Sequence, residues 1–301
     1  MNGTQAWFVA RARRFENVGL VLAAVVLGVA VPEPGRYADV LVTPLVIFLI
    51  YGSLRGITLT DVEYGSYGLV ILCSLAVSYL VLPFGGIRVA NALLSGDALI
   101  GMAIMLAAPT TAGSAIIWTR LAGGDSKLAA FASISSLGVA PLLTPAVLSA
   151  LLDRRVVMPI ETMVVDLLVI VGGGVALLIT IPDRLVSERL VDRGSGVAIL
   201  LLIYSSIASV DVRAIDPASF GTVSLFVLFL LGGGFVLVRA ISNVMGIDRS
   251  TYLPFFFTGG LKNLGIALVI AFTYRSAMVV VVIVTYYVLQ QLVGAVIADV
   301  A

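Results

Sequence analysis

One lysine stands within an otherwise apolar segment, residues 256–268, which reads FFTGGLKNLGIAL. Lys262 comes after Gly259 and Gly260 and directly before Asn263. A charge in the hydrocarbon of a membrane is costly and marks a substrate or ion pathway, and glycines weaken the helix that carries it. We therefore predict a functional ammonium at Lys262, which either binds an anionic group or takes the place of a coupling cation.

The alternative for Lys262 is that its side chain snorkels to a membrane surface. Thr251 lies 11 residues before it, which corresponds to about 16 Å of helix at about 1.5 Å per residue. A lysine side chain reaches about 6 Å, so its ammonium falls short of water. We expect instead that the helix break frees backbone carbonyls, which bind the ammonium together with Thr258 and Asn263.

A second interrupted segment, residues 105–117, reads MLAAPTTAGSAII. Pro109 and Gly113 interrupt the ladder of helical hydrogen bonds, and freed backbone groups are tolerated at membrane depth only where protein or a cavity satisfies them. The alternative is an ordinary kink, and small polar residues also hold membrane helices together. Because the N-terminus of a half-helix attracts anions, we expect the hydroxyl residues at this break to contribute to a site: Thr110, Thr111 and Ser114.

Asp166 is the other ionisable residue that stands clearly within an apolar span, in TMVVDLLVIV. It lies about a turn and a half from the start of its span, so an acid at the membrane interface explains it, and a place on a proton path is the alternative. A polar strip in the last apolar span is expected mainly to pack between helices: Tyr286, Tyr287, Gln290 and Gln291.

The composition is that of an integral membrane protein. Of the 301 residues, 60% are hydrophobic and 12% are charged, and the mean hydropathy is +1.13, far more apolar than a soluble domain. The net charge of +1 argues against a nucleic-acid partner. The chain has no histidine and one cysteine, Cys73, which excludes a Ser-His dyad and a disulfide. We expect neither an enzyme nor a bound metal or cofactor.

Charged residues, prolines and glycines divide the chain into about ten apolar spans, and a span needs about 20 residues to cross a bilayer. Successive loops between the spans alternate between the two sides of the membrane, and the loops of one side, together with the N-terminal segment, carry most of the Lys and Arg residues. By the positive-inside rule this predicts that both termini are cytoplasmic and that the protein lies in the cell membrane. The expected spans are residues 16–32, 37–54, 66–86, 97–120, 126–151, 160–182, 194–213, 219–240, 250–274 and 276–299.

Ten spans divide into two units of five, and an odd number of spans inverts the second unit relative to the first. The charged link that follows residue 151 marks a boundary, so we predict one repeat over residues 1–155 and a second over residues 156–301. The two interrupted segments are then the fourth spans of their repeats. Broken helices at matching positions point to the substrate site of a transporter.

Around these breaks the chain resembles the bile acid:sodium symporter family. The resemblance rests on APTTAGSAI from residue 108, on RLAGGDSKLAAFASISSLGVAPLLTP from residue 120 and on TGGLKNLGIAL from residue 258. It implies an all-α fold in which discontinuous fourth and ninth helices cross at the membrane midplane. It also implies a core domain of spans three to five and eight to ten, and a panel domain of spans one, two, six and seven.

The chain departs from that family at positions which hold sodium. The glutamate of the ninth helix, which serves both sodium sites, falls on Thr258, and its glutamine partner falls on Lys262, while Asn263 is kept. The resemblance assigns five more positions. Two of them keep a hydroxyl, at Ser114 and Ser133. At the other three this chain has a different residue from the family: Ser78, ahead of Pro83, stands where the family has a glutamine, Ala115 where it has an asparagine and Ala129 where it has a serine.

These departures argue against bound sodium. The ion needs several oxygen ligands and a carboxylate to offset its dehydration. Repulsion between an ammonium and a sodium ion about 4 Å apart is about 4 kcal/mol at an effective dielectric constant of about 20. We therefore expect that the sodium sites are lost and that Lys262 supplies the charge in their place.

The predicted function is a secondary transporter that moves a small organic anion across the lipid bilayer by alternating access and without sodium. Transport would be coupled to protons if Lys262 releases its proton in one of the two access states. The alternatives are a sodium-coupled symporter of the same family and a channel or sensor with the same fold. An arsenical efflux protein is disfavoured because the fourth span has no cysteine, and an intramembrane protease because its catalytic motifs are absent.

Overall fold

The computed structural model describes residues 19–55, 64–152, 160–211, 215–274 and 276–300, and in these ranges the regular secondary structure is helical, with no β-strand. Six of the helices are long and apolar enough to cross a membrane. The prediction of an all-α membrane protein is confirmed at this level. The division into ten spans and two inverted repeats stays a prediction.

The helices of the first half are interrupted at two places. A π-helical turn joins α4 to α5, and the chain leaves the helical path between α6 and α7. The elements are a helix at Gly19–Ala30, α2 (Pro32–Arg36), η1 (Tyr37–Leu41), α3 (Val42–Leu54), α4 (Tyr64–Ala76), η2 (the π-helical turn, Val77–Val81), α5 (Leu82–Leu93), α6 (Gly96–Ala107), α7 (Ala112–Leu121) and α8 (Ser126–Leu152).

The second half has one such interruption, between α12 and α13. Side chains of Ser187, Asp216 and Asp248 cap the starts of α10, α11 and α12 by accepting hydrogen bonds from backbone N–H groups. The elements are α9 (Ile160–Thr180), η4 (Asp183–Leu185), α10 (Glu188–Ala208), α11 (Pro217–Met245), α12 (Arg249–Gly260), α13 (Leu264–Phe272) and α14 (Ala277–Val300).

The start of α10 differs from the sequence prediction. The seventh span was expected to begin at residue 194 because four charged residues precede it, but α10 begins at Glu188. The Ser187 cap, whose hydroxyl accepts from the Leu190 N–H, adds this charged turn to the helix. The extra turns carry Glu188 and Asp192 on one helix face, since residues four apart are neighbours on a helix.

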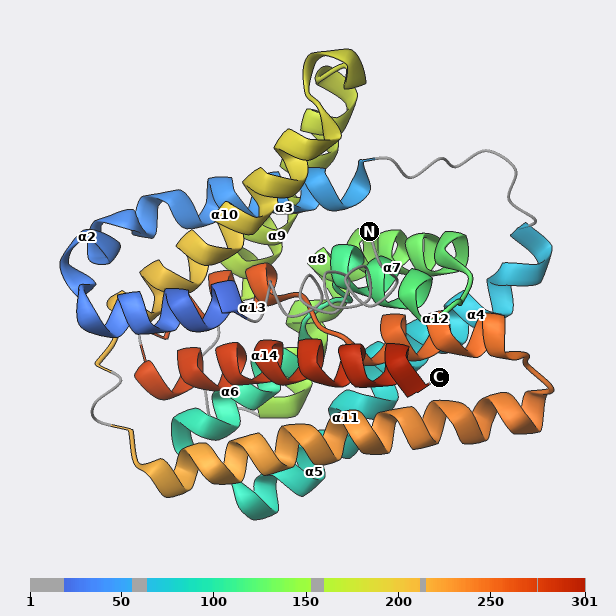
Figure 1. Cartoon of the computed structure of the whole chain (residues 1–301). Helices are drawn as coiled ribbons and strands as arrows, with labels where there is room; N and C mark the ends of the chain where they lie inside the picture. The colour runs from blue at the N-terminus through green and yellow to red at the C-terminus, as the bar shows by residue number, and fades with distance from the viewer. Residues whose placement is uncertain (1–18, 56–63, 153–159, 212–214, 275, 301) are drawn as a thin grey trace, which may run out of the picture.

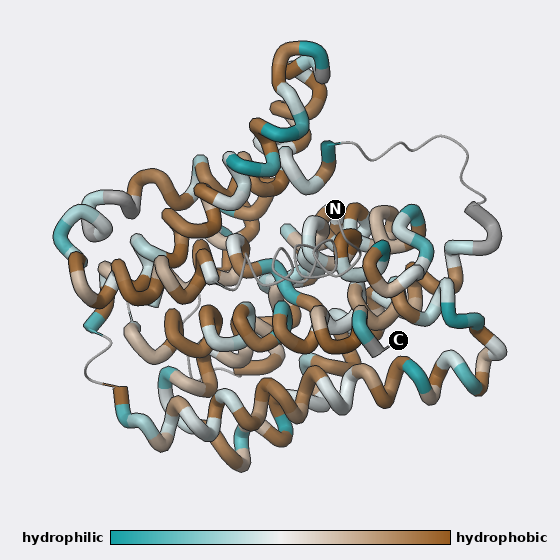
Figure 2. Tube along the Cα trace, in the orientation of Figure 1, coloured by the Kyte–Doolittle hydropathy of each residue, from teal (hydrophilic) through white to brown (hydrophobic). Residues whose placement is uncertain are grey.

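The helices pack against one another (Figure 1), and Figure 2 shows hydrophobic residues along most of their length. Helix α3 contacts α9 and α10, whereas α6 contacts α5, α8 and α14, and α12 contacts α4, α7 and α11. Along the outer face of α11, Leu225, Phe229 and Val236 are 71, 62 and 65% exposed. Large apolar side chains exposed in this way are suited to lipid.

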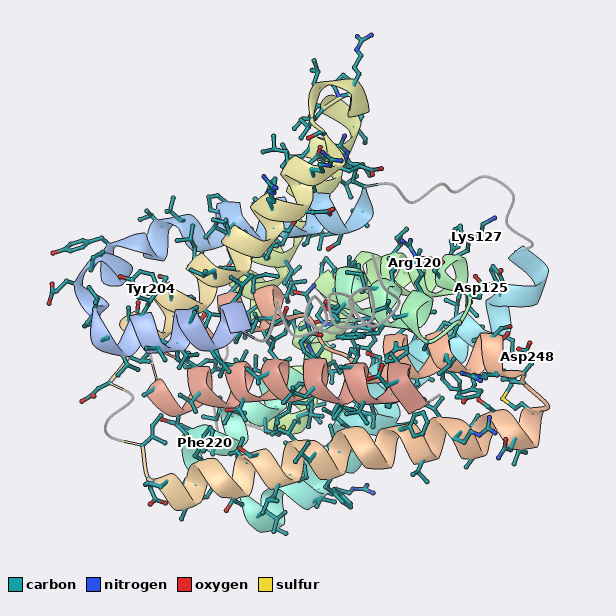
Figure 3. The ribbon with its side chains drawn as sticks, in the orientation of Figure 1. Arg120, Asp125, Lys127, Tyr204, Phe220 and Asp248 are labelled. Carbon is teal, nitrogen blue, oxygen red and sulfur yellow. The ribbon has the colours of Figure 1, made fainter. Side chains whose placement is uncertain are left out.

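Four charged residues labelled in Figure 3 lie toward the same side of the view. Arg120, Asp125 and Lys127 lie near Asp248 on the right, while Tyr204 marks the left. Asp125 caps the start of α8, accepts a hydrogen bond from the Tyr67 hydroxyl, and donates its N–H to the Ser250 carbonyl at 2.8 Å. These contacts hold the starts of α8 and α12 together.

Candidate functional site

The two interrupted helices meet directly at their breaks. Thr110, between α6 and α7, pairs with Lys262, between α12 and α13, as an isolated antiparallel β-bridge. The Asn263 N–H donates to the Pro109 carbonyl at 2.8 Å, and the Thr111 N–H donates to the Leu261 carbonyl at 3.3 Å. Backbone groups that one break leaves without helical hydrogen bonds are thus paired with backbone groups of the other break. Such pairing is required at membrane depth, where water is not available as a partner.

The side chain of Lys262 is fully buried, with 0% exposure. Its Nζ donates to the carbonyl oxygen of Ser78 at 2.6 Å, to the Ser78 hydroxyl oxygen at 2.9 Å and to the Ala108 carbonyl oxygen at 3.1 Å. The ring of Tyr79 lies 5.7 Å from Nζ, within the range of a cation–π contact. Three acceptors match the three donors of a lysine ammonium.

The Ser78 carbonyl is available because the helix around it is irregular. In the π-helical turn the Leu82 N–H donates to the Val77 carbonyl, one residue earlier than in an α-helix. The next residue, Pro83, has no N–H to offer to Ser78. A proline five residues after Ser78 was therefore the sequence signal for a free carbonyl at this position.

Lys262 differs from the sequence prediction in its partners. The prediction that backbone carbonyls bind its ammonium is confirmed by Ser78 and Ala108, but the predicted side-chain partners Thr258 and Asn263 serve their own half-helices. The Thr258 hydroxyl donates to the Pro254 carbonyl at 2.7 Å, and Asn263 Oδ1 accepts from the Ile266 N–H at 3.1 Å, capping α13. Nor does Lys262 line the cavity described below. Its side chain turns from the break toward the π-helical turn.

Helix α14 supports the break from its buried face. Gln290 Oε1 accepts from the Lys262 N–H at 2.8 Å, and Gln290 Nε2 donates to the Lys262 carbonyl at 3.0 Å. The Tyr286 hydroxyl donates to the Gly260 carbonyl at 3.1 Å, at the end of α12. We had expected this polar strip mainly to pack between helices. Gln290 and Tyr286 thus bind the backbone of the break, whereas Gln291 joins α14 to Trp118 and Ser114 of α7, as predicted for polar residues that pack between helices.

Thr110 and its neighbours complete the buried polar cluster. The Thr110 hydroxyl donates to the Thr258 carbonyl, and the Thr110 N–H donates to the Ser136 hydroxyl oxygen at 3.0 Å. The Tyr79 hydroxyl donates to the Ser136 carbonyl at 2.9 Å. The predicted residues Thr110, Thr258 and Lys262 therefore come together, with Ser136 and Tyr79 as additional members.

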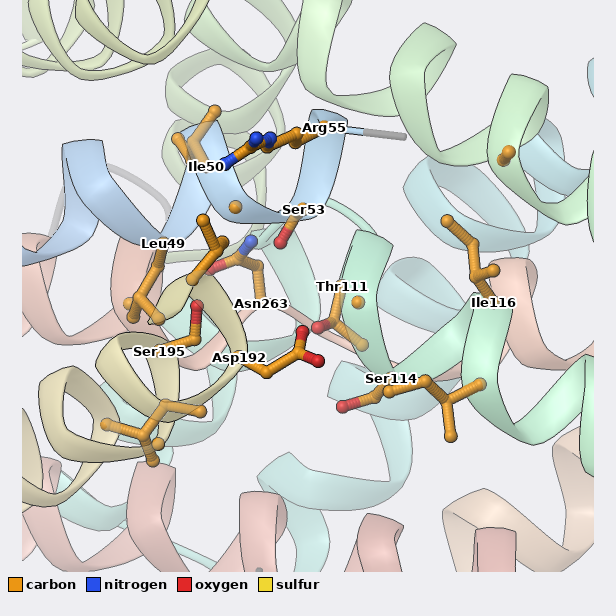
Figure 4. Close-up of a pocket in the computed structure, with 18 of the residues that line it drawn as sticks. Leu49, Ile50, Ser53, Arg55, Thr111, Ser114, Ile116, Asp192, Ser195 and Asn263 are labelled. Carbon is orange, nitrogen blue, oxygen red and sulfur yellow. The ribbon is translucent and has the colours of Figure 1, made fainter. Parts of the chain in front are cut away.

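A cavity of about 980 Å³ lies next to this cluster, between α3 and α10 on one side and α7, α13 and the start of α8 on the other. Thr111, Ser114 and Asn263 line it (Figure 4). These are residues at the N-terminal ends of the half-helices α7 and α13. Gly113 and Gly265 also line it. Both half-helices therefore present their N-terminal turns to the same space.

The cavity wall carries charged residues that sequence analysis had not assigned to the site. Glu188 and Asp192 come from α10, and Figure 4 shows the Asp192 carboxylate pointing toward Thr111 and Ser114. The basic residues of the wall are Arg55, Arg120 and Lys127. Arg55 donates to the Tyr51 hydroxyl and to the Val186 carbonyl, which ties the end of α3 to the segment before α10.

Ser114 takes part in a hydrogen-bond chain that links the cavity to α14. Gln291 Nε2 donates to the hydroxyl oxygens of Ser114 and Tyr287, at 3.1 Å each, and Gln291 Oε1 accepts from the Trp118 indole at 3.0 Å. Tyr287 lines the cavity as well. This arrangement fixes the Ser114 hydroxyl at the mouth of the α7 N-terminus.

Two predicted residues, Ser133 and Asp166, belong neither to the hydrogen-bonded cluster around Lys262 nor to the cavity wall. Ser133 is buried in α8, and among the described residues its hydroxyl has no hydrogen-bond partner. Asp166 lies on the exposed face of α9 and does not line the cavity. Gly259 and Gly260 form the buried end of α12, where a Cβ on Gly259 would lie 3.1 Å from Val77.

Comparisons with known proteins agree with the sequence resemblance. The model of the SBF-like CPA transporter family matches residues 17–301. The uncharacterized protein YbaS of Bacillus subtilis (strain 168) is 25% identical over 245 residues, which make up 76% of this chain and 78% of that protein. The family match spans both helix breaks and every residue that lines the cavity.

Proposed function

The chain belongs to the SBF-like CPA transporter family, and from this premise we propose that it is a secondary transporter of a small organic anion. The observation that carries the proposal is the convergence of two half-helix N-termini on one cavity. The partial positive charge of a helix N-terminus and its unpaired N–H groups attract anionic groups. The cavity is the size of typical sites for small molecules, about 300–1,000 Å³.

The α7 terminus is the better of the two for binding an anion. Asn263 caps α13 through its own side chain, whereas Thr111 at the start of α7 makes no such hydrogen bond. The first N–H groups of a helix have no partner within it. The N-terminal turn of α7, together with the hydroxyls of Thr111 and Ser114, therefore forms the proposed binding site for the anionic group. The substrate must also carry a hydrogen-bond donor or a cationic group to face the Asp192 carboxylate, which points toward the same hydroxyls.

Sodium independence is supported by the surroundings of Lys262. Its ammonium is bound by two main-chain carbonyls and a hydroxyl, which are the kind of oxygen ligands that a hard cation uses. Lys262 thus serves as a cation tethered to the chain, and it would repel a sodium ion at the same place. Its role in this proposal is to hold the crossing, and the anion binds at the cavity.

The grouping of the helices supports the proposal of alternating access. We assign the helix at Gly19–Ala30 together with α2, α3, α9 and α10 to a panel domain, and α4–α8 with α11–α14 to a core domain. The cavity lies between them, and its basic residues belong to the side that the positive-inside rule assigns to the cytoplasm. The conformation described here is then open to the cytoplasm.

A ligand screen on the purified protein tests this proposal. Melting temperatures are measured with a panel of small carboxylates, sulfonates and phosphates, in NaCl and in choline chloride, at several pH values. Each hit is then tested by counterflow in proteoliposomes, which separates a carrier from a channel or a sensor. We expect stabilisation and counterflow by one class of anion with equal strength in both salts. Counterflow that rises steeply with sodium at saturating anion would overturn the sodium-independent mechanism.

A further inference from the structure

We propose that Gln290 is a positioning residue of the transport site, which fixes the backbone of Lys262 and so keeps its ammonium on Ser78 and Ala108. The proposal rests on the proposed function for its significance, but the geometry that supports it stands on its own. Gln290 is fully buried in α14, with 0% exposure, and it does not line the cavity. Its hydrogen bonds to Lys262 go to the backbone and not to the ammonium.

The geometry of the β-bridge creates the need for such a residue. The hydrogen bonds of the bridge join the neighbours of Thr110 and Lys262, so these two residues form a non-hydrogen-bonded pair. In such a pair, each residue directs its own N–H and C=O away from the partner strand. Without water at this depth, both groups of Lys262 require partners from elsewhere in the protein.

A carboxamide can satisfy both groups at once. Gln290 accepts from the Lys262 N–H through Oε1 and donates to the Lys262 carbonyl through Nε2. It uses its carbonyl oxygen as the acceptor and one of its two N–H groups as the donor, and so takes the place of the peptide of a third strand. On the other edge of the bridge, Ser136 of α8 accepts from the Thr110 N–H. The crossing is thus held between α8 and α14.

The position of this peptide determines where the ammonium lies. The Lys262 stem is several bonds long, so a small rotation at the backbone moves Nζ away from Ser78 and Ala108. The Lys262 carbonyl belongs to the peptide bond with Asn263, and Asn263 lines the cavity and caps α13. Gln290 therefore couples the tethered cation to the floor of the cavity.

The chain is well suited to a test because it contains two lysines, Lys127 and Lys262. Lys127 is exposed, whereas Lys262 is fully buried and hydrogen-bonded. The full-length purified protein is treated with acetic anhydride, a small reagent that enters apolar regions, and acetylation at each lysine is followed by mass spectrometry. Lys127 reports the reactivity of the reagent in the same molecule.

The variants are Gln290→Met, which removes both hydrogen bonds, and Gln290→Glu, which keeps the acceptor but loses the donor. Gln291→Met is the matched control, since Gln291 is buried next in sequence and binds Ser114, Tyr287 and Trp118 instead. In Gln290→Met, we expect acetic anhydride to acetylate Lys262 about tenfold faster relative to Lys127 than in the wild type. A change of this size corresponds to the loss of at least one hydrogen bond. Gln290→Glu should give a smaller increase, and Gln291→Met should leave the ratio unchanged.

Two outcomes would overturn the assignment. One is a Lys262/Lys127 ratio that stays at the wild-type value in both Gln290 variants, and the other is an equal increase in Gln291→Met. If Gln290→Met does not fold, the Gln290→Glu result decides. Because labelling is independent of substrate, a negative result here leaves the transport proposal standing, and a failed transport assay leaves the positioning role of Gln290 intact.

Discussion

Lys262 binds Ser78 twice, through the serine carbonyl at 2.6 Å and the serine hydroxyl at 2.9 Å, although the two residues are 184 positions apart in the chain. This contact joins the ninth predicted span to the third. It also explains how a fully buried ammonium is tolerated without a carboxylate among its hydrogen-bond partners, since two carbonyls and a hydroxyl satisfy its donors.

Replacing Lys262 should destabilise the protein. Lys262→Met leaves the Ser78 and Ala108 carbonyls without this donor, and a buried acceptor that loses its partner costs about 1–3 kcal/mol. We expect a fall in melting temperature on the order of 2–5 °C for a chain of this size. Lys127→Met, at the exposed lysine, is the control and should leave the melting temperature unchanged. Equal or higher stability of Lys262→Met would mean that the desolvation of the ammonium outweighs its hydrogen bonds.

Lys262→Gln tests the role of the charge. We expect this variant either to lose transport or to become responsive to sodium, because the repulsion between ammonium and ion is removed while an oxygen ligand is added. Counterflow of the anion identified by the ligand screen is measured in sodium and in choline. Wild-type transport with an unchanged pH dependence in the variant would show that Lys262 takes no part in coupling.

Pro83 should control the availability of the Ser78 carbonyl. Pro83→Ala restores an N–H at the position that a π-helical turn would pair with Ser78, so the helix itself then competes with the Lys262 ammonium. We expect faster acetylation of Lys262 relative to Lys127. Pro44→Ala, at an exposed position of α3, serves as the comparison. If Lys262 remains equally protected in Pro83→Ala, the carbonyl is freed by the surrounding packing and not by the proline.

The wall between α3 and α7 offers a direct test of alternating access. A Cβ on Gly113 would lie 3.5 Å from the Ser53 hydroxyl oxygen, which is the place that the sulfur of a cysteine at residue 53 would take, so the two sulfurs come within reach of each other. Ser53→Cys with Gly113→Cys, in a Cys73→Ala background, should cross-link in this conformation and stop counterflow until the bond is reduced. The single-cysteine variants are the controls. Full transport by the oxidised protein would refute movement of α3 against α7.

Acid should weaken the start of α12. Hydrogen bonds from Thr251 and Ser250 hold the pKa of Asp248 below its ordinary value of 3.8. The stability that this cap contributes is therefore present above the ordinary pKa and is lost as the pH falls through the lower, folded-state value. Between about pH 6 and pH 3, the melting temperature of Asp248→Asn should therefore fall less than that of the wild type.

Much of the architecture could be predicted from local sequence. Pro109 with Gly113, and Gly259 with Gly260, indicated where the fourth and ninth predicted spans are interrupted, because glycine and proline act on the backbone of their own segment. The burial of Lys262 could be predicted as well, since its distance along the helix from a charged end exceeds the length of its side chain. Both inferences depend only on residues that are neighbours in sequence.

The boundaries near charged turns were harder to predict. The charges of residues 188–193 indicated a loop, but the Ser187 cap begins α10 there and turns Asp192 toward the cavity. A charged turn is compatible with a loop and with a helix that borders water, and local composition does not distinguish them. Which face of that turn meets the cavity depends on how α10 packs against α3 and α13.

The sequence by itself therefore determined that the chain is helical and apolar, where two helices break and which cation is buried at one of the breaks. Only the tertiary structure decided what that cation binds. Ser78, Ala108 and Gln290 come from segments far apart in the chain, and their hydrogen bonds depend on the rotation and depth of each packed helix. Periodicity specifies neither of these, so backbone carbonyls could be predicted as partners of Lys262 in general, but not the carbonyls of Ser78 and Ala108 on other helices in place of its sequence neighbours Thr258 and Asn263.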